Sequence, residues 1–233
     1  MQKNIYTFER VEKKYLVSRE KAEMLKKELA GELVPDSHGI NTVNSLYLDN
    51  DSFLLIRNSI EAEAYKEKLR IRCYGDFEDD KTVFFEIKKK FKGVVYKRRV
   101  SMPYSQALEY VFTGKPPLDS QIMREIDYAM KVYRDVKPRV LISCEREAYF
   151  FSSDPTLRLT IDYGIRYSTL DGKAPTPIIS DTDAVMELKS SGSIPVWLSL
   201  ALERCGIYPT RFSKYAHAYY DITKKRKYIN MKR

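Results

Sequence analysis

Residues that commonly build metal and disulfide sites are scarce in this sequence. Its 233 residues include two histidines, three cysteines and one tryptophan. Cys73, Cys144 and Cys205 are odd in number and widely spaced, and no Cys-X-X-Cys or Cys/His ligand spacing occurs. This pattern excludes a disulfide framework and a zinc site of the usual spacing, and it favours a reducing compartment. We therefore predict a cytoplasmic location.

Glycine and long apolar runs are also scarce. Nine glycines occur, and no Gly-rich Walker-type loop is present, so a bound phosphate would have to be held by side chains. The longest apolar stretch, IPVWLSLAL at 194–202, is far shorter than the roughly 20 residues that span a bilayer. The N-terminal residues have no apolar core of signal-peptide length. We expect no membrane segment.

Positive charge is in excess, but much of it lies in one short segment. The net charge is +9, and residues 224–233 contain six lysines or arginines and no acid. Residues 1–223 therefore carry only +3, which makes the overall charge a weak argument for nucleic-acid binding. No nucleic-acid motif is present, and we expect no nucleic-acid partner. We predict a single domain over 1–223 and a basic tail over 224–233.

Four cations alternate in the stretch KEKLRIR at 66–72. In a strand, Lys66, Lys68, Arg70 and Arg72 share one face, because successive side chains point to opposite faces. Neighbours on that face are about 6 to 7 Å apart. Each pair then repels by roughly 2 to 3 kcal/mol at an effective dielectric of 20, or well under 1 kcal/mol in water. Either water covers this face or an anion lies along it.

Alternating hydrophobicity and turn residues predict an α+β fold with antiparallel strands and helices packed outside. Strands are predicted at 5–17, 42–49, 63–75, 82–91, 94–102, 139–151, 157–167 and 183–190. Helices are predicted at 18–29 with Ser18 as N-cap, within 49–60, and at 104–112, 119–136 (closed by Pro138), 195–206 (with Pro195 in its first turn) and 211–222. The order is not the βαβ repeat of a parallel sheet.

Charged residues recur on one face of the predicted strands. Besides the four cations above, these faces carry Arg10, Glu12 and Lys14; Phe84, Glu86 and Lys88; Lys97 and Arg99; Arg146; Arg158, Thr160 and Asp162; and Val185, Glu187 and Lys189. One solvated face is usual in an antiparallel sheet. Here cations outnumber acids, and a barrel with these faces inward would need anions and a divalent metal to offset the buried charge. Linear polyphosphate or a nucleoside triphosphate meets that need, with carboxylates holding the metal.

Nine short motifs occur in the order seen in VTC domains. They are RVEKKY (10–15), SLYLD (45–49), KLRIRCYG (68–75), FEIKKK (85–90), YKRR (96–99), CEREAY (144–149), RLTID (158–162), MELK (186–189) and FSKY (212–215). The chain thus resembles, over about residues 6–220, the polyphosphate polymerase domains of the vacuolar transporter chaperone complex and their bacterial relatives. These belong to the triphosphate tunnel metalloenzymes, as do the CYTH proteins. The resemblance implies an eight-stranded antiparallel β-tunnel with a charged interior.

The resemblance also implies a site and its substrates, ATP and inorganic polyphosphate. In the family, Mn²⁺ or Mg²⁺ assists transfer of the ATP γ-phosphoryl group to a growing polyphosphate chain. By matching motif, the residues expected around the reacting phosphoryl group are Lys214, Arg70, Arg72 and Arg146. By the same matching, further phosphate ligands are expected at Lys14, Lys88, Lys97, Arg158 and Lys189, and a metal ligand at Glu187. The charged strand faces add Lys68 and Arg10 as expected phosphate ligands, and Glu12 and Glu86 as expected metal ligands. Lys66 and Lys68 are expected toward the tunnel mouth, where they would guide the anionic chain.

One motif departs from the CYTH pattern and bears on the reaction. CYTH hydrolases and cyclases resemble one another in an ExExK start, whereas this chain has Arg10-Val11-Glu12-Lys13-Lys14. The arginine removes one potential metal ligand and adds a cation, which favours the VTC branch and predicts a polyphosphate polymerase. A metal-dependent triphosphatase or tripolyphosphatase of the same fold remains an alternative, as does a non-catalytic polyphosphate-binding domain.

Overall fold

Two compact units make up the part of the chain that the computed structural model describes, which is residues 11–37, 39–61, 64–92 and 94–223. Unit 1 comprises the described residues up to Asn41, with Glu145–Gly164 and Ile179–Phe212. Unit 2 comprises Thr42–Cys144, Ile165–Ile178 and the described residues from Ser213 on. The segments of the two units alternate along the sequence. The single domain over 1–223 stays a prediction, and the basic tail lies outside the described residues.

The strands form one antiparallel system. They are β1 (Val11–Ser18), β2 (Leu33–Pro35), β3 (Asn41–Asp49), β4 (Tyr65–Tyr74), β5 (Thr82–Phe91), β6 (Val94–Pro103), β7 (Lys137–Phe151), β8 (Arg158–Thr169), β9 (Thr176–Pro177) and β10 (Asp183–Ser190). Eight of them follow the order β1-β10-β8-β7-β3-β4-β5-β6, while β2 pairs with β7 and β9 with β8. Every pair with a described register is antiparallel. The predicted α+β class and eight-stranded antiparallel sheet are confirmed.

The helices are short and distributed over both units. They are α1 (Arg19–Glu28), α2 (Leu54–Glu61), α3 (Tyr104–Thr113), α4 (Gln121–Tyr133), α5 (Val196–Arg204) and α6 (Lys214–Ile222). Among the described residues, no helix combines the length and the apolar character needed to cross a membrane.

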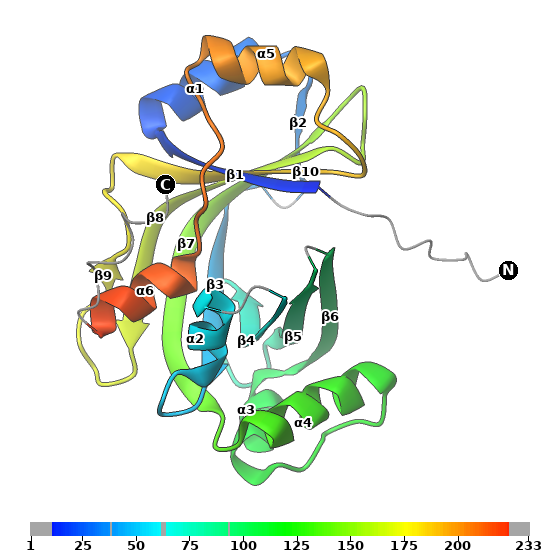
Figure 1. Cartoon of the computed structure of the whole chain (residues 1–233), viewed down its shortest axis with the longest axis vertical. Coiled ribbons are helices and arrows are strands. Elements are labelled where there is room, and N and C mark those ends of the chain that lie inside the picture. The colour runs from blue at the N-terminus through cyan, green and yellow to red at the C-terminus, as the bar shows by residue number, and fades with distance from the viewer. Residues whose placement is uncertain (1–10, 38, 62–63, 93, 224–233) are drawn as a thin grey trace, which may run out of the picture. The chain divides into compact units, whose positions relative to one another are not determined.

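Unit 1 buries its core between helices and one face of its strands. Helices α1 and α5 cover β1, β10 and the first part of β8 (Figure 1). Helix α1 begins after Ser18, whose hydroxyl accepts a hydrogen bond from the Lys21 backbone N–H, so the predicted N-cap is confirmed. Ala22 and Leu25 of α1 are fully buried in the same cluster as Tyr15 of β1. The opposite face of these strands is therefore left to polar residues.

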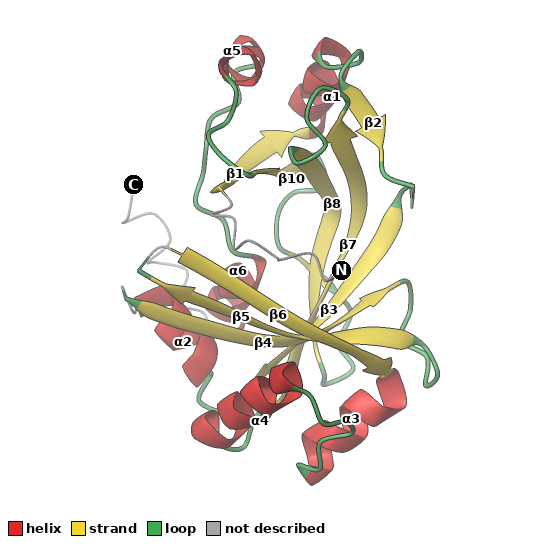
Figure 2. Cartoon of the chain, turned by 90° about the vertical axis from the view of Figure 1, so that its right-hand side faces the viewer, coloured by secondary structure: helices red, strands yellow, loops and turns green. Residues whose placement is uncertain are grey.

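Unit 2 repeats this arrangement with other elements. Helices α3 and α4 pack on the apolar face of β4, β5 and β6 (Figure 2). In β4, Leu69, Ile71 and Cys73 are fully buried on this side, and the residues between them are partly exposed on the other. Tyr110 of α3 and Ile126 of α4 complete the contact. The period of two in KEKLRIR thus separates an apolar face from a polar one.

Helix α6 differs from these helices because it contacts the polar side of the unit 2 strands. The Tyr215 ring stacks on the ring of Tyr47 in β3 with centroids 4.4 Å apart. The Tyr215 hydroxyl donates a hydrogen bond to Asp49 at 3.0 Å, and Asp49 also accepts the backbone N–H groups of Leu55 and Ile56 at the start of α2. One buried carboxylate thus joins β3, α2 and α6.

Some predicted helix ends were wrong. Helix α4 ends at Tyr133 rather than at 136, because Arg134 and Asp135 have positive φ angles of 48° and 50° that a right-handed helix cannot contain. Pro138, predicted to close this helix, lies within β7. Pro195 is the N-cap residue of α5 and not part of its first turn.

The structure also differs from the predicted boundaries at the last helix and in two short strands. The last helix begins at Lys214 and not at 211, because the Ser213 side chain caps it by accepting from the Ala216 N–H. Residues 5–10 of the predicted first strand lie outside the described residues. The two- and three-residue strands β9 and β2 were not predicted, since they are too short to show a period.

Candidate functional site

One face of unit 2 concentrates positive charge, and we call it the cation face. It consists of Lys66, Lys68, Arg70 and Arg72 of β4, Glu86, Lys88 and Lys90 of β5, and Lys97 and Arg99 of β6, all placed by strand alternation and register. Glu86 is the one acid among these residues of the described strands β4–β6.

The middle of the cation face is the arginine row, in which Tyr47, Arg70, Glu86 and Arg99 lie opposite one another across four strands. Arg70 Nε and Nη2 each lie 2.7 Å from the same oxygen of Glu86. Arg70 Nη1 donates to the Tyr47 hydroxyl at 3.2 Å, and Lys97 Nζ lies 2.5 Å from the other Glu86 oxygen. Because Glu86 is only 1% exposed, these contacts fix the Arg70 guanidinium in one orientation.

Charges in the arginine row shift each other's ionisation. Burial alone would raise the pKa of Glu86, but Arg70, Arg72 and Lys97 lower it to about 2. Burial lowers the pKa of Lys97 to about 8, helped by Arg70 and Arg72 and opposed by Glu86. Glu86 is therefore a carboxylate at neutral pH, held between two cations.

Tyr47 has an unusual environment for a buried phenol. Burial by itself would raise its pKa, but Arg70, Lys68 and Arg72 together lower it to about 8. The Arg70 guanidinium also lies 5.9 Å from the centre of the Tyr47 ring. Nearby cations therefore favour the tyrosinate, as they would favour any other anion placed among them.

Helix α6 brings Lys214 to the same region of unit 2. Lys68 Nζ donates to the hydroxyl of Ser213, the N-cap residue of α6, at 3.1 Å. Lys214 Nζ lies 3.7 Å from the sulfur of Cys144 on β7. Through these contacts and the Tyr215–Tyr47 stack, the structure brings together the predicted residues Lys68, Arg70 and Lys214.

The other end of the cation face is formed by the lysine rows. Lys68 lies opposite Lys88, which lies opposite Lys97, and two residues further along β4 Lys66 lies opposite Lys90. At the arginine-row side, Arg72 lies between Ser45 and Phe84.

Unit 1 has a different arrangement of charges on β1 and β10, and we call this group of four residues the mixed-charge cluster. Glu12 and Lys14 of β1 lie opposite Lys189 and Glu187 of β10, so the charges alternate in both directions. Lys14 Nζ is 3.4 Å from Glu12 and 3.9 Å from Glu187, and Lys189 Nζ is 2.7 Å from Glu187. These side chains are 15% to 33% exposed, so water reaches them.

Two further predicted phosphate ligands lie in unit 1 and differ in burial. Arg146 of β7 forms a two-pronged ion pair with Asp162 of β8, with Nε and Nη2 at 2.6 and 2.7 Å from its oxygens. Arg158 is 59% exposed and lies 3.8 Å from Asp36. The predicted ligand Arg10 lies outside the described residues.

The three predicted metal ligands are divided between the two units. Glu12 and Glu187 belong to the mixed-charge cluster of unit 1, whereas Glu86 belongs to unit 2 and contacts Arg70 and Lys97. Within the described residues, no set of three His, Cys, Asp or Glu side chains is placed to hold a metal ion. Two carboxylates near one ammonium do fit a Mg²⁺- or Mn²⁺-type ion, which commonly takes one or two protein carboxylates and completes its shell with phosphate and water oxygens.

Two residues of the site were not predicted to act in it: Tyr47 and Ser213. Tyr47 and Ser213 are part of the motifs SLYLD and FSKY, and Tyr47 has the parity of Ser45, which lies opposite Arg72. The alternation of side chains along the strand therefore already placed Tyr47 on the same face as Ser45. Asp162 was placed on the polar face among the carboxylates that could serve a metal, and the structure pairs it with Arg146.

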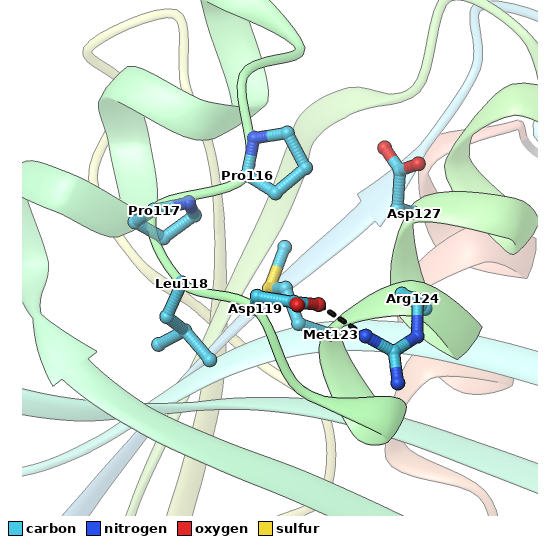
Figure 3. Close-up of a pocket in the computed structure, with 7 residues that line it drawn as sticks. All are labelled: Pro116, Pro117, Leu118, Asp119, Met123, Arg124 and Asp127. Carbon is cyan, nitrogen blue, oxygen red and sulfur yellow. Dashed lines mark hydrogen bonds and ion pairs between the residues drawn. The ribbon is translucent and has the colours of Figure 1, made fainter.

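A surface pocket of about 390 Å³ in unit 2 contains none of the predicted site residues (Figure 3). It is lined by Pro116, Pro117, Leu118, Asp119, Met123, Arg124 and Asp127. Asp119 and Arg124 form an ion pair across it. The pocket has one cation and two acids, so it does not suit a polyphosphate.

Two solved structures have the same fold at low sequence identity. A putative adenylate cyclase from Bacillus halodurans is 16% identical with a TM-score of 0.55, and 88% of this chain and 95% of that chain are covered. A putative adenylyl cyclase from Hippeastrum, which has a dominant triphosphatase activity, is 17% identical with a TM-score of 0.56, covering 89% and 93%. The chain therefore shares the fold of these two proteins.

The VTC domain model matches residues 9–222, and the chain therefore belongs to the VTC domain family. It is 26% identical over 220 residues to vacuolar transporter chaperone complex subunit 4 of Trypanosoma brucei brucei, covering 75% of this chain and 28% of that protein. The corresponding subunit of Trypanosoma cruzi is 25% identical over 237 residues, covering 81% and 29%. The chain spans less than a third of the length of either relative.

Proposed function

We propose that the chain is a polyphosphate polymerase that transfers the γ-phosphoryl group of ATP to the end of an inorganic polyphosphate chain, assisted by Mn²⁺ or Mg²⁺. A terminal phosphate oxygen of the chain attacks the γ-phosphorus, the bond from the γ-phosphorus to the bridging oxygen breaks, and ADP leaves. Membership of the VTC family and the similarity to subunit 4 of the chaperone complex support this proposal.

The observation that favours transfer over hydrolysis is that the predicted carboxylates are already ion-paired. Each of the predicted carboxylates contacts a cation: Glu12 contacts Lys14, Glu187 contacts Lys14 and Lys189, and Glu86 contacts Arg70 and Lys97. A hydrolase must orient water, and a carboxylate already bound to a cation is a poor acceptor for its proton. The end of a polyphosphate is already an oxyanion and needs no such base.

In this proposal the chain's cations supply positioning and charge stabilisation, which dominate phosphoryl transfer. Arg70 and Arg72 bind phosphate oxygens in unit 2, and Lys214 neutralises charge on the transferred group. Arg146, Arg158, Lys14 and Lys189 bind phosphates in unit 1. A divalent ion would be held by Glu187 with Glu12, and it would neutralise phosphate charge. The assignments of Glu86 as a metal ligand and of Arg10 as a phosphate ligand stay predictions, as does a cytoplasmic location.

The test uses ATP labelled at the γ-phosphate, Mn²⁺ and a short polyphosphate primer, with products resolved on a gel. We expect a ladder of labelled chains that is lost in Lys214→Ala and in Glu187→Ala. Lys115→Gln, at an exposed loop position, is the control and should keep the ladder. Labelled orthophosphate without a ladder would assign the chain to a triphosphatase. Polyphosphate binding without turnover would leave a non-catalytic binding domain.

A further inference from the structure

One phenylalanine of β5 lies on the polar face of the strand instead of in the core. Val83, Phe85 and Ile87 are fully buried on the apolar face. Phe84 alternates with them, so it shares the polar face with Glu86, and it is partly exposed. An aromatic side chain among charged neighbours is not explained by the packing of the core or by the binding of phosphates.

Two further side chains of unit 2 contact the Phe84 ring. The ring of Tyr74 in β4 meets it edge to face, with centroids 6.1 Å apart and planes at 79°. Tyr74 follows Arg72 by two residues, so it lies on the same face of β4, and it is 40% exposed. The guanidinium carbon of Arg99 in β6 lies 4.6 Å from the centre of the Phe84 ring. We call Phe84, Tyr74 and Arg99 the aromatic platform.

The aromatic platform adjoins the arginines that are proposed to bind phosphates. Arg72 lies directly opposite Phe84, so their Cβ atoms are about 5 Å apart. Two residues further along β5, Glu86 lies opposite Arg70. On the other side of Phe84, the next residue of β5 on this face is the uncharged Thr82. The platform therefore lies where the charged part of the face ends.

An aromatic ring with a guanidinium over it is suited to a planar, uncharged group. Nucleobases stack on aromatic side chains and on the planes of arginine guanidinium groups. An inorganic phosphate gains no such contact from an apolar ring, because it has no π-face. Stacking uses a surface that every base has, so it does not distinguish adenine from guanine.

We propose that the aromatic platform binds the base of the nucleoside triphosphate, next to the arginines proposed to hold its phosphates. This inference rests on the proposed function for the presence of a nucleotide. It adds a site for the part of the substrate that is not phosphate. It also orients the nucleotide, with the base toward Phe84 and Tyr74 and the phosphates toward Arg70.

The experiment compares the binding of two ligands by titration in the presence of Mg²⁺. The first is the analogue of ATP in which nitrogen replaces the β,γ-bridging oxygen, and the second is inorganic tripolyphosphate, which has no base. The test variant is Phe84→Leu, which keeps an apolar side chain but removes the ring. Phe84→Trp keeps a ring. Phe112→Leu is the control, because Phe112 is an exposed aromatic residue of α3 outside the cation face.

We expect Phe84→Leu to lose about tenfold in affinity for the ATP analogue and to bind tripolyphosphate almost unchanged. Phe84→Trp should keep the affinity for the analogue, and Phe112→Leu should keep the affinity for both ligands. Melting curves check that the variants fold. Equal losses for both ligands would show a merely structural role and overturn the proposal. No loss for the analogue, or the same loss in Phe112→Leu, would also overturn it.

A second measurement detects the base directly. Saturation transferred by NMR from the aromatic protons of the wild type should reach the adenine protons of the analogue. The transfer should fall sharply in Phe84→Leu and persist in Phe112→Leu. Adenine protons that receive the same saturation in both variants would place the base elsewhere and overturn the proposal.

Failure of the proposed function is distinguishable from failure of this inference. If the analogue binds through Phe84 but labelled ATP gives no ladder, the polymerase is wrong and the base site stands. If the ladder forms and the KM for ATP is the same in Phe84→Leu as in the wild type, the base site is wrong and the polymerase stands. A wild type that binds neither ligand overturns both.

Discussion

The polar face of unit 1 alternates its charges, whereas the cation face of unit 2 repeats one sign. In the mixed-charge cluster, Lys14 lies opposite Glu187 and Glu12 opposite Lys189, so each charge has an opposite neighbour. On the cation face, Glu86 is the one acid of the described strands β4–β6, and the lysine rows place cation against cation. The first arrangement places opposite charges side by side, whereas the second places like charges side by side.

The difference shows that a count of cations is a poor guide to phosphate binding. Lys14 and Lys189 are cations already in contact with carboxylates, and a phosphate must displace or share those contacts. Arg70 is also ion-paired, but its partner Glu86 is buried and orients the guanidinium. In unit 1, the ion pairs therefore compete with a phosphate for the lysines. In unit 2, the ion pair with Glu86 holds the Arg70 guanidinium in one orientation before a ligand binds. The predictions below test this contrast.

Removing Arg70 should have the largest effect on stability. Arg70→Ala removes the guanidinium that contacts the buried carboxylate of Glu86, and we expect a loss of about 3 to 5 kcal/mol in the free energy of unfolding. Denaturant unfolding measures it. Arg99→Ala is the matched control, because Arg99 is an exposed residue of the same row. A similar small loss in both variants would show that water reaches Glu86.

Breaking the buried ion pair between Arg146 and Asp162 in unit 1 should likewise lower the free energy of unfolding. Asp162→Ala leaves Arg146 without its two-pronged partner, and we expect a loss of about 3 kcal/mol, since Asp162 is 3% exposed. Arg158→Ala should lose less than about 1 kcal/mol, because Arg158 is mostly exposed. If the order of the two losses is reversed, the burial argument fails.

The ionisation of the Tyr47 hydroxyl measures how strongly the nearby cations favour an anion at the cation face. Its pKa of about 8 predicts a rise in tyrosinate absorbance centred near pH 8, before the other shifted tyrosines, whose pKa values are raised mainly by burial. Tyr47→Phe should abolish this step, and Tyr208→Phe, at an exposed position, should keep it. Lys68→Gln should move the step to higher pH, because it removes a cation that favours the tyrosinate. A first step near pH 10 in the wild type would refute the prediction.

Removing Lys14 should have the smallest effect on stability. Its ion pairs are partly exposed, so Lys14→Gln should change the free energy of unfolding by less than about 1 kcal/mol. The same substitution removes the cation between Glu12 and Glu187, and Mn²⁺ titrated into the phosphate-free protein should bind more tightly. Glu187→Gln should weaken that binding. Unchanged Mn²⁺ affinity in both variants would argue against a metal at this cluster.

Strong alternation made the strands predictable, and β5 and β10 match their predicted ranges. The end of α4 was not predictable in the same way, because Arg134 and Asp135 adopt positive φ angles without a glycine to signal them. The division into two units could not be predicted from the sequence either, since the segments of the two units alternate along the chain.

Within the candidate site, parity identified which residues share a face but not which of them lie opposite one another. Glu86 was therefore predicted as a metal ligand from its place on the charged strand face, two residues from Lys88. The register shows it between Arg70 and Arg99, and Lys97 reaches it from the next row. Like-charge rows and buried ion pairs depend on strand pairing, which a single sequence does not contain.

The hydrogen bond between Tyr215 and Asp49 also has a consequence for how the protein is made. It joins residues that are 166 positions apart, and helix α6 carries Lys214. During synthesis, strands β3 to β6 can pair long before α6 leaves the ribosome. A chain that has been translated only as far as β10 contains the residues of the cation face but lacks Lys214, the lysine proposed to neutralise the transferred group. Under the proposed function, such a chain would gain this lysine only when α6 is made.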